Sequence, residues 1–190
     1  LHGGRRDVEK AGQAGKKAVE IDPNNLEARY NIVNILDAEG KPQEAIAALS
    51  ELVSSTAKRN YSTGERNNRI VLIERLGLMY RANEQYEQAA KTFQSIAELD
   101  PAAGGRSAGQ VIETWRIAKN YENALAEAAA AAQKYPDDRV VRGVRASLLA
   151  ETGKTAEAVA ELKKLLDGKN DRETWITLAQ IYEKGKDYAE

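Results

Sequence analysis

The chain has 190 residues, of which 42% are hydrophobic and 30% are charged, and its formal net charge at pH 7 is −1. A charge so close to zero argues against a general nucleic-acid binder, which would carry a basic excess, and no apolar run approaches the roughly 18 residues of a membrane span. The chain has no cysteine, which excludes disulfides, thiol catalysis and thiolate metal sites. We therefore expect a soluble protein without membrane insertion, compatible with either the cytoplasm or the periplasm.

Helical periodicity, capping residues and turn residues predict a series of helices joined by short turns. The turns include DPNN at 22–25 and EGKP at 39–42, in which Pro42 takes a first-turn position where a missing N–H costs nothing. In chain order, the predicted helices cover residues 5–21, 26–39, 42–57, 63–82, 84–99, 106–118, 121–135, 139–152, 155–167 and 172–184.

Five alanines recur at a nearly constant interval, which indicates an internal repeat. They are Ala11, Ala45, Ala89, Ala124 and Ala158, here called the period alanines, and all but one of the steps between them are nearly equal. A glycine lies five positions before two of them, and a proline lies twelve positions after three of them. A period of about 34 residues, read as helix, turn, helix, is typical of an array in which each repeat packs only against its neighbours. We call the first helix of each repeat A and the second helix B.

The residues around the period alanines resemble the tetratricopeptide repeat (TPR) pattern. The repeat that contains Ala89 reproduces the pattern nearly in full, and residues 175–182 match its first half. The matching residues are Leu76, Gly77, Tyr80, Tyr86, Ala89, Phe93 and Pro101, then Trp175, Leu178, Ala179 and Tyr182. The resemblance implies an all-α, right-handed superhelical α-solenoid of TPR-like helix-turn-helix repeats, with the A helices on the concave inner face and the B helices outside.

Four side chains stand out against this pattern. Arg145 stands where a core leucine is expected, so we expect either an acidic partner for its charge or a rotated helix. Trp115 and Trp175 are predicted core residues. The small Ala128 is expected to compensate for the large volume of Trp115.

The repeat boundaries predict one TPR-like array over residues 1–190. Its parts are a partial repeat at 1–25, a repeat at 26–59, an insertion at 60–69, repeats at 70–103, 104–138 and 139–172, and a partial repeat at 173–190. Because the array begins with a B helix and ends with an A helix, we expect it to be a piece of a longer solenoid or of a larger protein.

The one long interval, between Ala45 and Ala89, points to extra residues within 54–69. The sequence STGE at 62–65 resembles a capping box, so the insertion is expected to lengthen the A helix that follows. The segment is also basic, with Lys58, Arg59, Arg66 and Arg69 against Glu65. A protruding contact element is therefore the alternative.

No residue pattern in the chain supports catalysis. His2 is the one histidine, so a Ser-His-Asp triad or a histidine-containing zinc site would have to be built at this end of the chain. The sequence ETGKT at 151–155 lacks the first glycine of a phosphate-binding loop, because Leu148 occupies that position. We expect no enzyme activity, no cofactor and no metal.

A mixed set of side chains remains on the groove side of the A helices once the core positions are assigned. The candidate peptide-binding residues are Tyr30, Asn31, Asn34, Val71, Arg75, Leu78, Arg106, Gln110 and Val144. Apolar groups, amides and arginines together suit an extended peptide. Some TPR modules hold a C-terminal carboxylate with a lysine, asparagine and arginine clamp; Asn34, Arg75 and Arg106 are similar to it, although Tyr30 replaces its lysine.

The charges separate between the two kinds of helix. The three central A helices hold ten basic and four acidic residues, an excess of +6, whereas the second to fourth B helices hold three basic and eight acidic residues, an excess of −5. This distribution favours an acidic segment or a chain terminus as the partner.

The predicted function is a non-catalytic protein–protein interaction scaffold that binds a partner peptide or protein segment in its concave groove. The first alternative is a structural, self-assembling spacer that associates end to end through its terminal repeats. An RNA-binding helical repeat is the other alternative, which the near-neutral charge and the TPR-type pattern disfavour.

Overall fold

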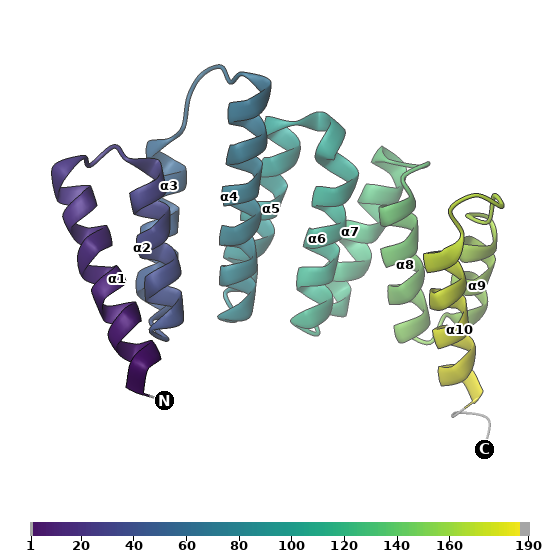
Figure 1. The fold of residues 1–190 in the computed structure, drawn as a ribbon. Helices are drawn as coiled ribbons and strands as arrows, with labels where there is room; N and C mark the ends of the chain where they lie inside the picture. Colours follow the sequence, from purple (N-terminus) through teal and green to yellow (C-terminus); the bar gives the residue numbers. More distant parts are fainter. Residues whose placement is uncertain (1, 187–190) are drawn as a thin grey trace. The chain divides into compact units, whose positions relative to one another are not determined.

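The computed structural model describes the backbone of residues 2–186 and the side chains of residues 12–184. This part of the chain contains ten α-helices, one short 3₁₀ helix and no β-strand (Figure 1). The predicted all-α repeat architecture is thereby confirmed. The side chains of His2 and Ala11 lie outside the described residues.

The helices form two compact units, Leu1–Gln85 and Tyr86–Glu190. Unit 1 holds α1 (His2–Ile21), α2 (Leu26–Ala38), α3 (Pro42–Ser55) and α4 (Thr63–Ala82). Unit 2 holds α5 (Tyr86–Leu99), the 3₁₀ helix η1 (Pro101–Ala103), α6 (Gly104–Ile117), α7 (Tyr121–Lys134), α8 (Arg139–Glu151), α9 (Thr155–Lys163) and α10 (Arg172–Lys186). One continuous array over residues 1–190 stays a prediction.

In unit 1, a buried cluster joins α2, α3 and α4. Val33 of α2 and Leu49 of α3 have no exposed surface, and Leu76 of α4 packs with them. Each of these helices presents one apolar stripe, so the cluster can only form where the three stripes meet.

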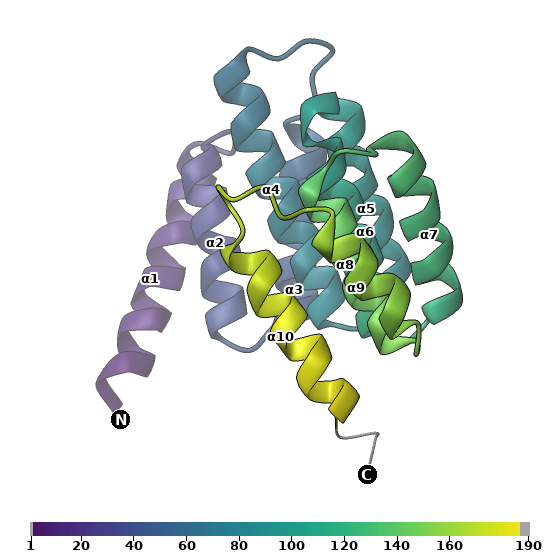
Figure 2. The same ribbon diagram turned by 90° about the vertical axis from the view of Figure 1, so that its right-hand side faces the viewer.

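In unit 2, two buried clusters share α8. One joins α6, α7 and α8 through residues such as Ile112, Ala128 and Leu148. The other joins α8, α9 and α10 through residues such as Leu162 and Leu178. Helices thus pack on their nearest neighbours in sequence, as a solenoid requires. Figures 1 and 2 agree in placing α6, α8 and α10 on one side of unit 2 and α7 and α9 on the other.

The period alanines mark the crossings between A and B helices. Ala45, Ala89, Ala124 and Ala158 each have 0% exposure, which confirms the predicted register. Five positions before each alanine the chain turns with a positive φ, at Gly40 (71°), Glu84 (60°), Lys119 (57°) and Gly153 (86°). The same left-handed turn is therefore used in every repeat, with glycine, which adopts it without strain, at only two of the four positions.

The insertion lengthens α4 to 20 residues, as predicted, and its first turn carries a complete capping box. The N–H of Glu65 donates to the hydroxyl of Ser62 at 3.3 Å, and the N–H of Ser62 donates to the carboxylate of Glu65 at 3.0 Å. The ammonium of Lys58 also donates to Glu65. The Lys58 hydrogen bond, followed by those from Ser62, lowers the pKa of the Glu65 carboxyl to about 2.

Arg69 fixes the start of this long helix to the end of α3. Its guanidinium donates to the backbone oxygen of Val53 at 2.6 Å and to the hydroxyl of Thr56 at 3.0 Å. It also lies 5.6 Å from the ring centre of Tyr61, within the range of a cation–π contact. Arg69 thus ties the insertion to α3 and to its own Tyr61, and whether the segment contacts a partner stays a prediction.

Two sequence expectations are wrong in detail. Trp175 is 57% exposed rather than in the core, because no described helix covers its face of α10. Helix α9 ends at Lys163, earlier than the predicted end at residue 167. In the following loop the carboxylate of Asp167 accepts from the N–H groups of Lys169 (2.9 Å) and Asn170 (3.4 Å), and such side-chain turns compete with helix continuation.

Arg145 has the acidic partner that its position requires. The side chain is half-buried, and its guanidinium donates to a carboxylate oxygen of Glu161 on α9. On the same helix, Val141 and Leu148 are fully buried. The prediction for Arg145 is confirmed, since its stem passes the core and its charge is paired. Trp115 is half-buried against the cluster that contains Ala128, also as predicted.

Candidate functional site

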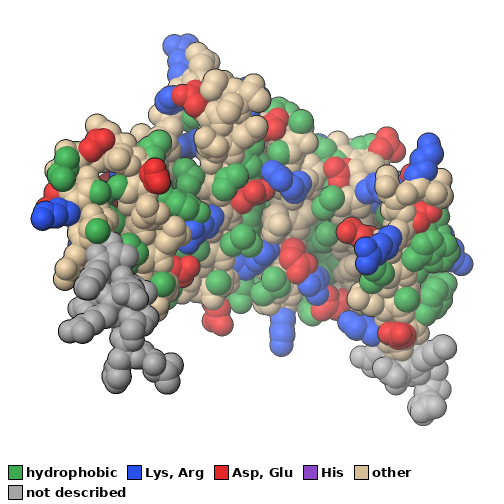
Figure 3. Space-filling model, viewed as in Figure 1, with side chains coloured by type: hydrophobic (Ala, Val, Ile, Leu, Met, Phe, Trp, Pro, Cys, Tyr) green, Lys and Arg blue, Asp and Glu red, His purple; other side chains and the backbone are tan. Residues whose placement is uncertain are grey.

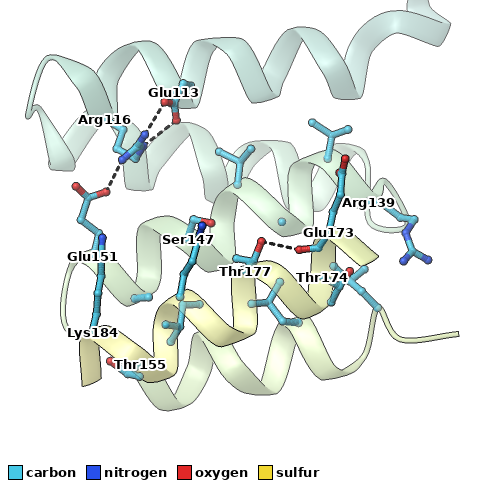
Figure 4. Close-up of a pocket in the computed structure, with 18 of the residues that line it drawn as sticks. Glu113, Arg116, Arg139, Ser147, Glu151, Thr155, Glu173, Thr174, Thr177 and Lys184 are labelled. Atoms are coloured by element: carbon cyan, nitrogen blue, oxygen red, sulfur yellow. Dashed lines mark hydrogen bonds and ion pairs between the residues drawn. The ribbon is translucent and has the colours of Figure 1, made fainter. Parts of the chain in front are cut away.

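A groove runs along α8 in unit 2, with α6 on one side and α10 on the other (Figure 4). Its volume is about 1230 Å³. We call it the α8 groove; its main lining residues are Glu113, Arg116, Arg139, Val140, Gly143, Val144, Ser147, Glu151, Glu173, Thr177, Gln180 and Lys184.

The floor of the α8 groove is a stripe of small and apolar residues on α8. Val140, Gly143, Val144 and Ser147 follow one another at helical spacing, which places them on one face of the helix. A Cβ added to Gly143 would meet no atom within 4 Å. The floor is therefore open above this glycine, and space for a ligand exists there.

The α10 residues that line the groove occupy the same repeat positions as the α8 residues that line it. These wall residues, Glu173, Thr177, Gln180 and Lys184, stand one repeat after Val140, Val144, Ser147 and Glu151, in that order. The hydroxyl of Thr177 donates to the backbone oxygen of Glu173 at 2.9 Å. Hydroxyl and amide groups therefore lie along this wall between charged side chains at its ends.

One end of the groove holds a charged cluster centred on Arg116. Its guanidinium donates to Glu113 at 2.5 and 2.7 Å and to Glu151 at 3.0 Å, and the hydroxyl of Tyr121 donates to Glu151 at 3.2 Å. The hydrogen bond with Glu113 is the largest of the effects that raise the pKa of Arg116, and burial followed by the charge of Glu151 raises the pKa of Tyr121. Arg116 thus remains protonated, and its charge is balanced within the protein.

Arg139 forms a second charged cluster at the other end of α8. It donates to Asp167 at 2.9 Å and to the backbone oxygen of Asn170 at 3.1 Å, and it lies 3.6 Å from Asp171. Basic and acidic side chains are interspersed over α6 and α8 in Figure 3. The basic excess counted on the A helices is therefore compensated in this groove by nearby carboxylates.

A second group of candidate residues meets in unit 1 around Arg75 of α4. Its Nη1 donates to the hydroxyl of Tyr30 at 2.6 Å and to Oδ1 of Asn34 at 2.5 Å, both on α2. The guanidinium carbon lies 4.8 Å from the ring centre of Tyr30, and Nη2 is 3.7 Å from Asp37. We call these four residues the Arg75 cluster.

Two apolar candidates flank this cluster on α4. Val71 lies one helical turn before Arg75 and Leu78 lies one turn after it, so all three share one helix face. Val71 is 56% exposed and Leu78 is 45% exposed. The structure thus brings Tyr30, Arg75 and their apolar neighbours together on one side of unit 1.

The other candidates lie elsewhere. Asn31 and Asn34 line a hollow of about 510 Å³ between α1 and α2. Val144 lines the α8 groove. Arg106 and Gln110 lie one turn apart on α6 and do not line this groove. The predicted peptide site is thus divided among these places, and the carboxylate clamp that includes Arg106 stays a prediction.

The groove-lining residues of α10 were absent from the sequence-based set. A signal for them exists, because Val144 is predicted to lie on the groove side and Thr177 has the same repeat position on α10. These polar residues were missed because the predicted set ends at Val144.

No group of three or more histidine, cysteine, aspartate or glutamate residues suited to a metal ion occurs in the described part of the chain. None of its described helices is both long and apolar enough to cross a membrane.

Comparisons with known proteins point to one repeat family. Two family models, both described as tetratricopeptide repeat, match residues 4–63 and residues 74–103. A comparison with curated proteins gave no match.

Several solved structures resemble most of the chain. The TPR-like repeats of a putative kinesin light chain from Podosopora anserina share 15% identity, with 95% of this chain and 90% of that chain covered and a TM-score of 0.58. MamA from residue 41 to its end, from Desulfovibrio magneticus RS-1, shares 16% identity, with 84% of each chain covered and a TM-score of 0.56. YrrB, described as a TPR protein with an unusual peptide-binding site, shares 16% identity, with 92% of this chain and 85% of that chain covered and a TM-score of 0.50. At such identities the likeness to these structures concerns the fold alone. The two family models, which match residues 4–63 and 74–103, show that the chain is a tetratricopeptide repeat protein.

Proposed function

We propose that the chain is a non-catalytic scaffold for protein–protein interaction and that the α8 groove holds a segment of the partner. The observation that carries this proposal is the open volume of about 1230 Å³ along α8, which exceeds the roughly 300–1000 Å³ of small-molecule pockets. YrrB, which has a similar fold, is described by its peptide-binding site, and a comparable role for this chain is part of the proposal.

The dimensions of the groove suit an extended peptide of a few residues. Helix α8 has 13 residues, so its length is about 20 Å at roughly 1.5 Å per residue. An extended chain advances about 3.3 Å per residue, and about six residues would therefore span the groove.

The lining chemistry supports the same kind of ligand. Val140 and Val144 offer apolar contacts to alternate side chains, while Ser147, Thr177 and Gln180 offer hydrogen-bonding groups to a peptide backbone. A peptide bound in extended form needs both, because its backbone N–H and C=O groups lose water on binding.

In unit 1, the Arg75 cluster is proposed as a separate contact for an acidic side chain or a C-terminal carboxylate of a partner. Tyr30 and Asn34 accept from Arg75, so the hydroxyl hydrogen of Tyr30 and the amide N–H groups of Asn34 can still donate. A half-exposed arginine with two neighbouring donors favours a carboxylate. Exposed ion pairs contribute only about 0–1 kcal/mol each, so binding should weaken with salt without being lost.

The experiment is a selection of short peptides from a random display library on the purified chain, followed by titration of the selected peptides with variants. Gly143→Leu places a side chain on the floor of the α8 groove, whereas Gly64→Leu makes the same change in α4, where an added Cβ also meets nothing within 4 Å. We expect at least a tenfold loss of affinity for Gly143→Leu and none for Gly64→Leu. Equal affinities for the two variants would contradict the assignment of the groove.

The charge preference of the Arg75 cluster has its own test, a titration with acidic peptides and with peptides that end in a free carboxylate. Arg75→Glu should weaken the binding of peptides that end in a free carboxylate or contain acidic residues, and Glu98→Lys on α5 is the control on an exposed residue of a B helix. A loss of binding in Glu98→Lys alone would place the partner on the B-helix face instead.

A further inference from the structure

Two glycines of unit 2 occupy the same repeat position but have different surroundings. Gly109 of α6 stands one repeat before Gly143 of α8. A Cβ added to Gly109 would lie 2.9 Å from Cγ1 of Val140 and 3.9 Å from Cγ2 of Val144, both on α8. A Cβ added to Gly143 would meet no atom within 4 Å. The valines of the next A helix therefore fill the space beside Gly109, whereas the space beside Gly143 is open.

The residues of α10 give the reason for this open space. Glu173 and Thr177 of α10 have the repeat positions that Val140 and Val144 have on α8. Both line the groove (Figure 4), and Glu173 is exposed. Because an unpaired carboxylate is costly to bury, Glu173 does not pack against the glycine as a valine does. The place of that valine is thus free for an apolar group from another molecule.

The charges around the groove favour a cation as the ligand. The charged lining residues and their ion-pair partners include five carboxylates and three cations, an excess of two negative charges. The carboxylates belong to Glu113, Glu151, Asp167, Asp171 and Glu173, and the cations belong to Arg116, Arg139 and Lys184. Each arginine is already paired with two carboxylates, whereas the carboxylate of Glu173 forms no ion pair with any described residue. A cationic group is therefore complementary to the groove, and an anionic group is repelled.

A lysine or arginine side chain satisfies both features. Each has an apolar stem, which can lie along an apolar surface, and a charged head, which stays at the edge of that surface. Resting on the peptide binding proposed above, we infer that the α8 groove selects a partner segment that contains a lysine or an arginine. The stem of this side chain packs beside Gly143 and Val144, and its charged head pairs with the carboxylate of Glu173. Glu173 is then the residue that determines the specificity of the groove.

This preference is opposite in sign to that of the Arg75 cluster. Arg75 lies near one carboxylate, that of Asp37 at 3.7 Å, whereas Arg139 in unit 2 is paired with Asp167 and Asp171. These two aspartates lie between α9 and α10, so a count of charges on the A helices alone does not include them. The two sites therefore accept groups of opposite charge.

The test uses peptides that the display selection enriches on the wild-type chain and that lose affinity for Gly143→Leu. They should share a lysine or an arginine at one position. Replacing the arginine with citrulline, or the lysine with norleucine, retains an apolar stem and removes the charge. Binding should then weaken about three- to fivefold, as expected for one exposed ion pair.

A protein variant identifies the partner of this charge. Glu173→Gln should weaken the binding of the basic peptide by the same factor and leave the binding of its neutral counterpart unchanged, because the charge pair is already absent. Glu183→Gln makes the same change at an exposed residue of α10 that does not line the groove. This control should bind both peptides as the wild type does.

A second selection reverses the charge. On Glu173→Arg, the enriched peptides should carry aspartate or glutamate at the position where the wild type selects lysine or arginine. Peptides that are blocked by Gly143→Leu but share no basic residue, or that bind Glu173→Gln with wild-type affinity, would overturn this inference and leave the proposed function intact. A selection that returns no peptide sensitive to Gly143→Leu would overturn both.

Discussion

Two glycines of unit 2 should respond to the same substitution with opposite signs. Gly143 lies inside α8, and an added Cβ would meet no atom within 4 Å. Alanine is favoured over glycine by about 1 kcal/mol in a helix interior, so Gly143→Ala should stabilise unit 2 by about 0.5–1 kcal/mol.

Gly105 is different because a Cβ there would lie 1.9 Å from Oδ2 of Asp138. The carboxylate of Asp138 caps α8 by accepting from the N–H groups of Val140 at 2.9 Å and Val141 at 3.0 Å. It would have to move, and loss of an N-cap costs about 0.5–2 kcal/mol. The gain in helix propensity is small at the second residue of α6, so Gly105→Ala should be destabilising by about 1 kcal/mol.

Urea titration followed by tryptophan fluorescence measures this difference, because both tryptophans, Trp115 and Trp175, belong to unit 2. A change of about 1 kcal/mol corresponds to a shift of roughly 4–8 °C in melting temperature for a unit of this size, so thermal melts by circular dichroism provide a second measurement. The reasoning would be refuted if Gly105→Ala were as stable as Gly143→Ala, or if both shifted in one direction.

Three further predictions concern the core, the half-buried ion pair of Arg145 and Glu161, and acid stability. Ala89→Leu and Ala124→Leu should each destabilise the protein by about 1–3 kcal/mol, because both alanines have 0% exposure; thermal melts at wild-type stability would show that the helix crossings lie elsewhere. Arg145→Leu and Glu161→Leu should each lower the free energy of unfolding by roughly 1–3 kcal/mol, because the remaining partner loses its hydrogen bond. In urea titrations the double variant should recover most of this loss. Purely additive losses would argue against coupling between the two residues. Folding lowers the pKa of the Glu65 carboxyl to about 2. The contribution of Glu65 to stability should therefore be complete above its unfolded pKa of about 4.3 and should be lost as the pH falls toward 2. An NMR titration of this carboxyl with a midpoint near 4 would contradict the prediction.

Much of the fold follows from the sequence because a solenoid is built from local contacts. The spacing of the period alanines predicted the A–B crossings, and the four described members are fully buried. The capping box at residues 62–65 predicted the start of α4 for the same reason, since both partners lie within one turn of each other. Local patterns of this kind need no knowledge of distant residues.

The candidate site could be predicted only in part. The register placed Val144 on the groove side and Tyr30, Asn34 and Arg75 on a common side of unit 1, and these three do meet. The register did not reveal that the arginines of the A helices find carboxylates from other helices and loops, as Arg139 does with Asp167. That pairing depends on side-chain reach across helices, which spacing along one helix does not contain.

The helices, their order, the repeat period and the small residues at each crossing could all be predicted from the amino-acid sequence. This was possible because these features depend on contacts within a helix or between neighbours along the chain. Which helix faces are covered could not be predicted in this way and is seen in the packing of the helices. Trp175 has the repeat position of a core residue and is exposed, while α8 carries an open groove above Gly143. Burial depends on whether a second helix lies against a face, and an amphipathic pattern states the preference of that face without supplying the neighbour.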